Sequence, residues 1–85
     1  MNPFAVGWSN EAEDALALNW LHEPNRSALT LATELADRHL ANDPYRYGEL
    51  IAEGLWAIDV PPLRLYYEID QTNRRVEVTA VSRLV

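Results

Sequence analysis

The last third of the chain, residues 54–85, constrains the fold most because it reads as three consecutive β-strands. Residues 63–69 alternate between aliphatic or aromatic side chains and polar ones, which is the period of a strand with one buried face. The pair Pro61-Pro62 and the turn-forming residues 70–74 separate this strand from its neighbours. Connections this short join antiparallel strands, so the segment predicts an antiparallel meander. The predicted strands are 55–60, 63–69 and 76–83.

Two amphipathic helices are predicted ahead of these strands. The first, residues 10–23, follows an N-cap at Ser9. The second, residues 26–41, has its N-cap at Asn25 or Ser27 and ends before Pro44. Because the link between them is so short, we expect an antiparallel helical hairpin. The predicted inward faces comprise Ala12, Leu16, Ala17, Trp20 and Leu21 on the first helix, and Ala28, Leu29, Leu31, Ala32, Leu35, Ala36, His39 and Leu40 on the second.

The remaining segments complete the predicted architecture. The apolar run at residues 4–8 predicts a first strand, and residues 45–48 are expected to form a loop. The resulting order is β-α-α-β-β-β. We therefore predict a single α+β domain over residues 1–85, with an antiparallel sheet and the helical hairpin packed on one of its faces.

Composition limits the chemistry that this chain can perform. Thirteen acidic residues stand against seven arginines and no lysine, which gives a net charge of −6. Long-range attraction to a phosphate backbone is not expected, so nucleic-acid contact would require a local arginine cluster. The chain has no cysteine, and its two histidines lack metal-ligand spacing, so we expect no metal and no cofactor. The N-terminus lacks the pattern of a signal peptide, and no apolar run is long enough to span a bilayer, so we expect a cytoplasmic protein.

Two arginines on the predicted sheet are the first candidate site. Arg64, Tyr66 and Glu68 share the face opposite the aliphatic row of their strand, and this face stays open if the row packs on the helices. The register of the last strand decides whether Arg83 joins Arg64. Two arginines on one concave face would bind a phosphate through bidentate hydrogen bonds. The alternative is a solvent-exposed polar face with a cross-strand ion pair, such as Arg64 with Glu77.

An aromatic and basic cluster is the second candidate. Tyr45, Arg46 and Tyr47 are the residue types that stack on and clamp single-stranded nucleic acid, although such residues more often fill gaps between a loop and the core. Trp56 is interpreted either as a packing residue or as an anchor for a partner peptide. His39, on the apolar face of the second helix, is interpreted as a hydrogen-bonded core residue.

The chain resembles the RelE/ParE toxin superfamily. The resemblance rests on the element order, on WSNEAEDAL at residues 8–16, on DPYRYG at 43–48 and on LRLYYEID…RRVEVTAVSR near the C-terminus, and it covers nearly the whole chain. It implies a small α+β toxin from a type II toxin–antitoxin operon, with an extended antitoxin segment as partner. RelE-like members cleave mRNA in the ribosomal A site without a metal, whereas ParE-like members inhibit DNA gyrase. For this acidic chain we expect apolar contacts with the antitoxin, or a more basic antitoxin segment.

The resemblance also assigns roles to particular residues. Arg64 matches the arginine that contacts the scissile phosphate in the nucleases, and Arg46 matches the basic residue of the loop after the second helix. Arg83 lies near the position where nucleases place a basic residue beside a terminal His or Tyr, which the ending at 82–85 lacks. Asp59 stands where relatives often carry a positive charge.

These differences predict a toxin-like component of mRNA-interferase ancestry with weakened or lost nuclease activity. An active form would be a metal-independent, ribosome-dependent endoribonuclease with Arg64 and Arg83 as the catalytic residues. Arg46, Tyr45, Tyr47, Tyr66 and Trp56 would contact the nucleic acid or a partner. The alternatives are a ParE-like inhibitor of DNA gyrase and a non-toxic interaction domain, and a homodimer is left open.

Overall fold

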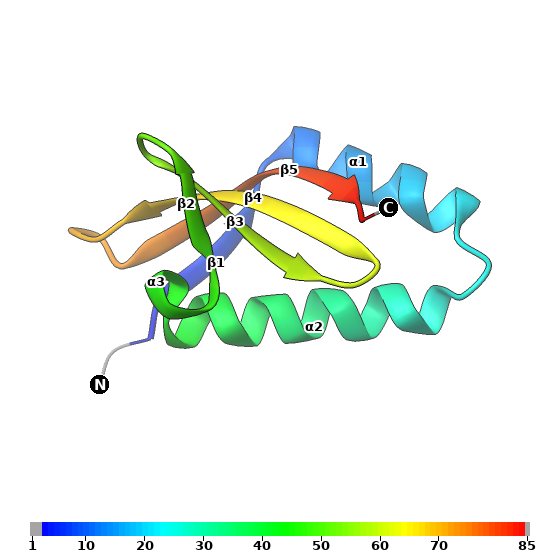
Figure 1. Ribbon diagram of the computed structural model, residues 1–85, viewed down its shortest axis with the longest axis horizontal. Helices are drawn as coiled ribbons and strands as arrows, with labels where there is room; N and C mark the ends of the chain where they lie inside the picture. Colours follow the sequence, from blue (N-terminus) through cyan, green and yellow to red (C-terminus); the bar gives the residue numbers. More distant parts are fainter. Residues whose placement is uncertain (1–2, 85) are drawn as a thin grey trace.

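A five-stranded sheet, with strand order β1-β5-β4-β3-β2, forms one layer of the structure (Figure 1). The computed structural model describes residues 3–84. The strand β1 is parallel to β5, and all other neighbours are antiparallel, which confirms the predicted meander. The strands are β1 (Ala5–Trp8), β2 (Glu49–Ala52), β3 (Leu55–Val60), β4 (Leu63–Asp70) and β5 (Arg75–Arg83), and the helices are α1 (Asn10–His22), α2 (Arg26–Asn42) and α3 (Pro44–Tyr47).

Helices α1 and α2 form the second layer and run in opposite directions (Figure 1). Each begins at the predicted kind of cap: the side chain of Ser9 accepts from the Ala12 N–H, and that of Asn25 accepts from the Ala28 N–H. Helix α1 packs along β5, and α2 packs against β3 and β1. The helical hairpin on one face of the sheet is therefore confirmed. No helix in the described part of the chain is long and apolar enough to cross a membrane.

The core lies between the helices and the inner row of β4. Leu63, Leu65 and Tyr67 are fully buried, as their alternation predicts. Leu21, Leu31 and Leu35 were predicted to face inward but are 70%, 66% and 40% exposed. The reason is geometric: each helix touches the sheet along a narrow stripe, which on α2 comprises Leu29, Ala32, Ala36 and Leu40, so leucines at the margin of the stripe remain outside the contact.

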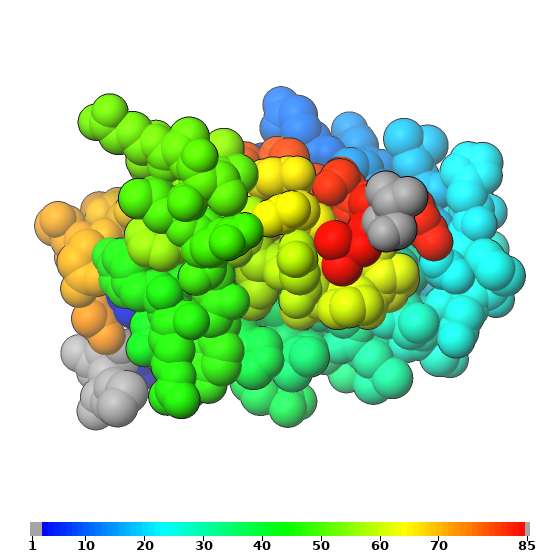
Figure 2. All heavy atoms as spheres, viewed as in Figure 1, coloured from blue at the N-terminus to red at the C-terminus, as the bar shows by residue number. Residues whose placement is uncertain are grey.

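Two short elements correct the sequence prediction. Residues 45–48, predicted as a loop, belong mostly to the single-turn helix α3, because the Asp43 side chain caps its N-terminus and Pro44 suits its first position. Strand β2 was not predicted, because all four of its residues are exposed and show no alternation of burial. It forms the edge of the sheet and makes a hairpin with β3 that projects from the body of the molecule (Figure 2).

A bulge in β5 decides which face each arginine occupies. One extra residue, Thr79, interrupts the pairing of β5 with β4. Because side chains alternate with a period of two, a one-residue insertion moves every later side chain to the other face. Arg83 consequently pairs with the buried Leu63 and lies on the helix-covered face, whereas Arg64 points to the open face.

Candidate functional site

Arg64 lies on the open face of the sheet, next to the edge hairpin. Its Nη2 donates to Glu49 Oε1 of β2 over 2.9 Å, and its Nε lies 3.3 Å from Asp59 Oδ1 of β3. The Arg64 side chain is 30% exposed. The guanidinium is therefore held between carboxylates from two strands, and one positive charge faces two negative ones.

The position of Glu49 depends on the glycine that precedes it. A Cβ atom at Gly48 would overlap the Tyr67 hydroxyl group and would lie 2.9 Å from the Ala57 carbonyl oxygen. Only glycine therefore lets the backbone pass this close to Tyr67, and the close passage brings Glu49 next to Arg64. A shallow pocket of about 270 Å³ results, lined by Tyr47, Gly48, Glu49, Ala57, Asp59 and Arg64.

Tyr67 itself is a structural residue and not a proton donor for the pocket. Its hydroxyl group donates to the Pro44 carbonyl oxygen over 2.6 Å in the buried interior. Burial, together with the negative charge of Asp43, raises the pKa of Tyr67 to about 12. The phenol therefore stays protonated and fixed to α3 at physiological pH.

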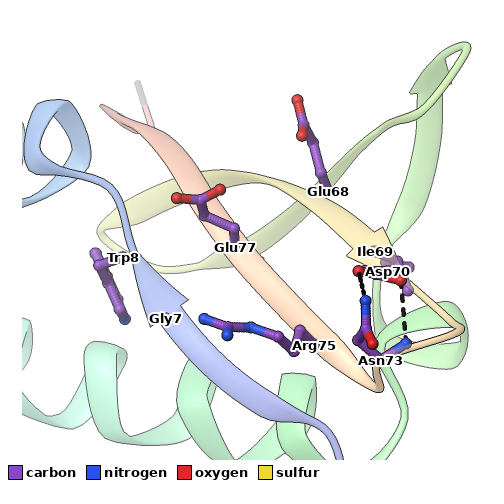
Figure 3. A pocket seen from close by; sticks show the side chains of 8 residues that line it. All are labelled: Gly7, Trp8, Glu68, Ile69, Asp70, Asn73, Arg75 and Glu77. Atoms are coloured by element: carbon purple, nitrogen blue, oxygen red, sulfur yellow. Dashed lines mark hydrogen bonds between the residues drawn. The ribbon is translucent and has the colours of Figure 1, made fainter.

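The rest of the open face is also acidic. Glu68 of β4 pairs directly with Glu77 of β5, and like charges opposite each other on a sheet repel. Figure 3 shows these carboxylates on one side of the sheet, beside a hollow of about 520 Å³ that Arg75 also lines. A phosphate group approaching this face meets a negative field. From β2 to β5 the face carries Arg64 and Arg75 against Glu49, Asp59, Glu68, Asp70 and Glu77.

Arg83 contacts helix α1 and does not approach Arg64. Its Nη2 donates to Glu23 Oε2 over 2.6 Å, and its Nη1 donates to Asn19 Oδ1 over 3.5 Å. The hydrogen bond from the Asn25 backbone N–H and the one from Arg83 lower the pKa of Glu23. Arg83 thus ties the end of β5 to the end of α1. The two arginines assigned to catalysis lie on opposite faces and do not converge on one phosphate.

Tyr45 and Trp56 have packing partners within the chain. The Tyr45 ring lies edge-on to Phe4 and to Trp56, with ring centroids 6.3 and 5.4 Å apart. Its hydroxyl group donates to Gln71 Oε1 over 3.0 Å. These contacts attach α3 to the sheet and to the β4–β5 turn. They favour the packing interpretation of both residues over the binding one.

The other predicted binding residues lie closer to Arg64. Tyr47 lines the pocket and stacks on His39, with ring centroids 4.0 Å apart, and the Arg46 guanidinium lies 5.5 Å from the Tyr47 ring centroid. Tyr66 shares the open face with Arg64. His39, interpreted from the sequence as a core residue, is only half-buried and belongs to this surface stack.

Glu49 is the site residue that the sequence analysis missed. Its carboxylate accepts a hydrogen bond from Arg64 and so occupies the guanidinium group that a phosphate would need. The side chain of Glu49 is 69% exposed, so solvent and substrates reach it. The sequence signal for this strand was Gly48 followed by the apolar residues of β2. A glycine directly before such a run indicates a strand whose backbone passes close to another part of the molecule.

Comparison with known proteins finds similarity at the level of structure. No protein-family model matches the sequence, and no curated protein matches it. In the toxin–antitoxin complex RelBE2 from Mycobacterium tuberculosis, one chain superposes with a TM-score of 0.79 at 26% identity, covering 99% of this chain and 94% of that one. The chromosomal ParDE system of P. aeruginosa contains a chain with a TM-score of 0.78 at 12% identity, covering 96% and 97%.

A third neighbour extends the comparison to the archaea. The RelE–RelB complex from Pyrococcus horikoshii contains a chain with a TM-score of 0.67 at 10% identity, covering 95% of this chain and 94% of that one. These neighbours are type II toxin–antitoxin proteins of nearly the same length and architecture. They confirm the resemblance seen in the sequence. The chain therefore shares the fold of these toxin–antitoxin proteins, as the resemblance of its sequence to the RelE/ParE toxin superfamily predicts.

Proposed function

We propose that this chain is the cytoplasmic, toxin-like component of a type II toxin–antitoxin module, of mRNA-interferase ancestry and with weakened or lost nuclease activity. Support for the first part comes from the neighbours, which were solved as toxin–antitoxin complexes and match over nearly their full length. The observation that carries the second part is the pairing of Arg64 with Glu49 and Asp59. An antitoxin is the partner that this role implies.

The chemistry of RNA cleavage explains why this pairing matters. Attack by a 2′-hydroxyl group needs a base, stabilisation of the charged phosphate and an acid for the leaving oxygen. The guanidinium of Arg64 would have to exchange its two carboxylates for the phosphate, and Arg83 lies on the opposite face. No histidine is among the described residues that line the pocket. Loss of general acid–base help alone costs roughly 10²–10⁴-fold in rate.

Induced expression in a bacterium, followed by mapping of mRNA 5′ ends, tests the proposal. We expect no ribosome-dependent cleavage pattern. Cleavage in the ribosomal A site that disappears in Arg64→Ala but persists in Arg38→Ala would contradict the loss of nuclease activity. Arg38 is the matched control because it is an exposed arginine on α2 and is not among the residues that line the Arg64 pocket.

A second experiment isolates the role of the two carboxylates. The double variant Glu49→Gln, Asp59→Asn frees the Arg64 guanidinium while changing little volume. We expect its affinity for a short single-stranded RNA to rise by about tenfold or more at low salt. The control is Asp14→Asn, Glu34→Gln, which removes the same charge from the exposed surfaces of α1 and α2. An equal gain in the control would show that net charge, and not release of Arg64, governs RNA binding.

A protein target of the ParE type is the second candidate function. Its support is the ParDE neighbour, together with four leucines on the helices that are 40–70% exposed. Apolar side chains gathered on helices suit contact with a protein better than contact with RNA. A DNA gyrase supercoiling assay tests this candidate, and absence of inhibition at high protein concentration would remove it. The four leucines are Leu18, Leu21, Leu31 and Leu35.

A further inference from the structure

A groove between α1 and α2 forms a second hollow, on the helix-covered side of the molecule. Its volume is about 420 Å³. One wall is formed by residues of α1 that are spaced by one helical turn, and the other wall is formed by α2. Trp8, the last residue of β1, also lines the groove. The residues that shape it are Trp8, Glu13, Leu16, Ala17, Trp20 and Asp37.

Two half-buried indole rings give the groove its aromatic character. Trp8 Nε1 donates to Asp37 Oδ1 over 3.2 Å, a bond between β1 and α2 that fixes the orientation of the ring. Trp20 enters from α1, with Leu16 and Ala17 completing the apolar part. The π-face of an indole attracts cations more strongly than any other aromatic side chain.

The charged side chains that line the groove are both acidic. Glu13 and Asp37 are exposed carboxylates, and no arginine is among the described residues that line it. Two basic groups lie beyond the lining: Arg26, whose Nε donates to the Trp20 carbonyl oxygen over 3.3 Å at the α1–α2 connection, and Arg75, which lines the first hollow together with Trp8. The groove therefore combines carboxylates with aromatic and apolar side chains.

We propose that this groove binds a basic side chain, arginine or lysine, presented by a partner protein. The alkyl stem would pack on Leu16 and the indole rings, and the cation would lie between Glu13 and Asp37. The groove is broadly open to solvent, which suits a side chain inserted from a protein surface, whereas a free small ligand is normally bound in a more enclosed cavity. The net charge of −6 likewise favours a basic partner. Cation binding here does not depend on the proposed toxin function.

Nuclear magnetic resonance of the ¹⁵N-labelled chain tests this proposal without a partner. The three indole N–H signals are followed during titration with N-acetylarginine amide. We expect the signals of Trp8 and Trp20 to shift, while that of Trp56, outside the groove, serves as the internal reference. N-acetylcitrulline amide has the same shape without the charge and should bind about tenfold more weakly. Equal binding of the two probes, or equal shifts of all three indoles, would overturn the proposal.

Matched variants assign the effect to the groove. Asp37→Asn and Glu13→Gln should each weaken binding of N-acetylarginine amide by about three- to tenfold, because each removes one charge next to the cation. Asn at position 37 keeps an acceptor oxygen for Trp8. Asp14→Asn and Glu34→Gln, on the same helices but outside the lining, should leave the affinity unchanged, and equal losses in these controls would contradict the site.

A third probe separates a protein side chain from a free cation. Methylguanidinium carries the charge without the alkyl stem, so we expect it to bind more weakly than N-acetylarginine amide. Equally tight binding of methylguanidinium would assign the groove to a free small cation and overturn the partner assignment. None of these titrations involves RNA or toxicity, so their failure is distinguishable from failure of the proposed function.

Discussion

Gly48 shows how one residue without a side chain shapes the candidate site. The backbone at this position passes so close to the Tyr67 hydroxyl group that a methyl group has no room. Strand β2 starts at the next residue, Glu49, which forms the ion pair with Arg64. The absence of a Cβ atom therefore matters more here than the conformational freedom of glycine.

Replacement of this glycine should destabilise the protein. We expect Gly48→Ala to lower the free energy of unfolding by about 1–3 kcal/mol, because the added methyl group overpacks a filled space. Urea denaturation measures the change. Gly7→Ala is the control: its Cβ atom would have its nearest neighbour at 4.0 Å, so its stability should stay the same or rise by up to about 1 kcal/mol.

A double variant identifies the cause of that loss. Tyr67→Phe alone removes a buried hydrogen bond to the Pro44 carbonyl oxygen and should cost about 1–3 kcal/mol. In combination with Gly48→Ala it also removes the overlapping oxygen, so the double variant should lose less than the sum of the single losses. Strict additivity would show that the hydroxyl group is not the obstacle.

At the scale of elements, the sequence pattern predicts those helices and strands whose formation depends on interactions between residues near each other in the chain. The helices α1 and α2, their caps at Ser9 and Asn25, and the strands β3, β4 and β5 follow from periodicity and capping chemistry. The bulge at Thr79 does not, because threonine is an ordinary strand residue and the extra position is defined only by the partner strand. Strand β2 was missed for a related reason, since an exposed edge strand lacks the alternation that burial imposes.

The same distinction separates the features of the candidate site that could be predicted from those that could not. The open face of Arg64 was predictable from the alternation of β4 alone. Its two carboxylate partners were not, because Glu49 and Asp59 come from other strands and meet Arg64 only through the register. The position of Arg83 depended on the bulge. Residue roles that depend on the register between two strands could therefore not be predicted from the sequence alone.

The ion pair at the end of β5 gives an element-scale prediction. The lowered pKa of Glu23 means that its ionised form is stabilised in the folded state, so this contribution is present above the ordinary value of 4.5 and disappears as pH falls through the folded pKa. Arg83→Ala should therefore unfold at lower urea concentration than the unmodified chain at neutral pH. The difference should shrink once Glu23 is protonated. Arg38→Ala serves as the control, and a difference between Arg83→Ala and the unmodified chain that is independent of pH would contradict the role of the pair.

At the scale of the whole molecule, negative charge is distributed over both candidate surfaces. The open sheet face carries more carboxylates than arginines, and the groove between the helices is lined by Glu13 and Asp37. Both surfaces therefore repel phosphate groups. The same charge favours basic protein partners, for which the antitoxin is the first candidate.

Ribosome association provides the whole-molecule test of this charge distribution. Proteins that bind RNA through phosphate contacts bind more tightly as salt is lowered, because fewer counterions compete. With a net charge of −6, this chain should remain unbound to ribosomes at about 0.15 M salt and also at about 0.01 M, where the Debye length reaches roughly 30 Å and repulsion is screened least. Sedimentation of the purified chain with ribosomes measures this directly. Co-sedimentation that strengthens at low salt would mean that a local basic contact overrides the acidic surface, and loss of that binding in Arg64→Ala would place the contact on the open sheet face.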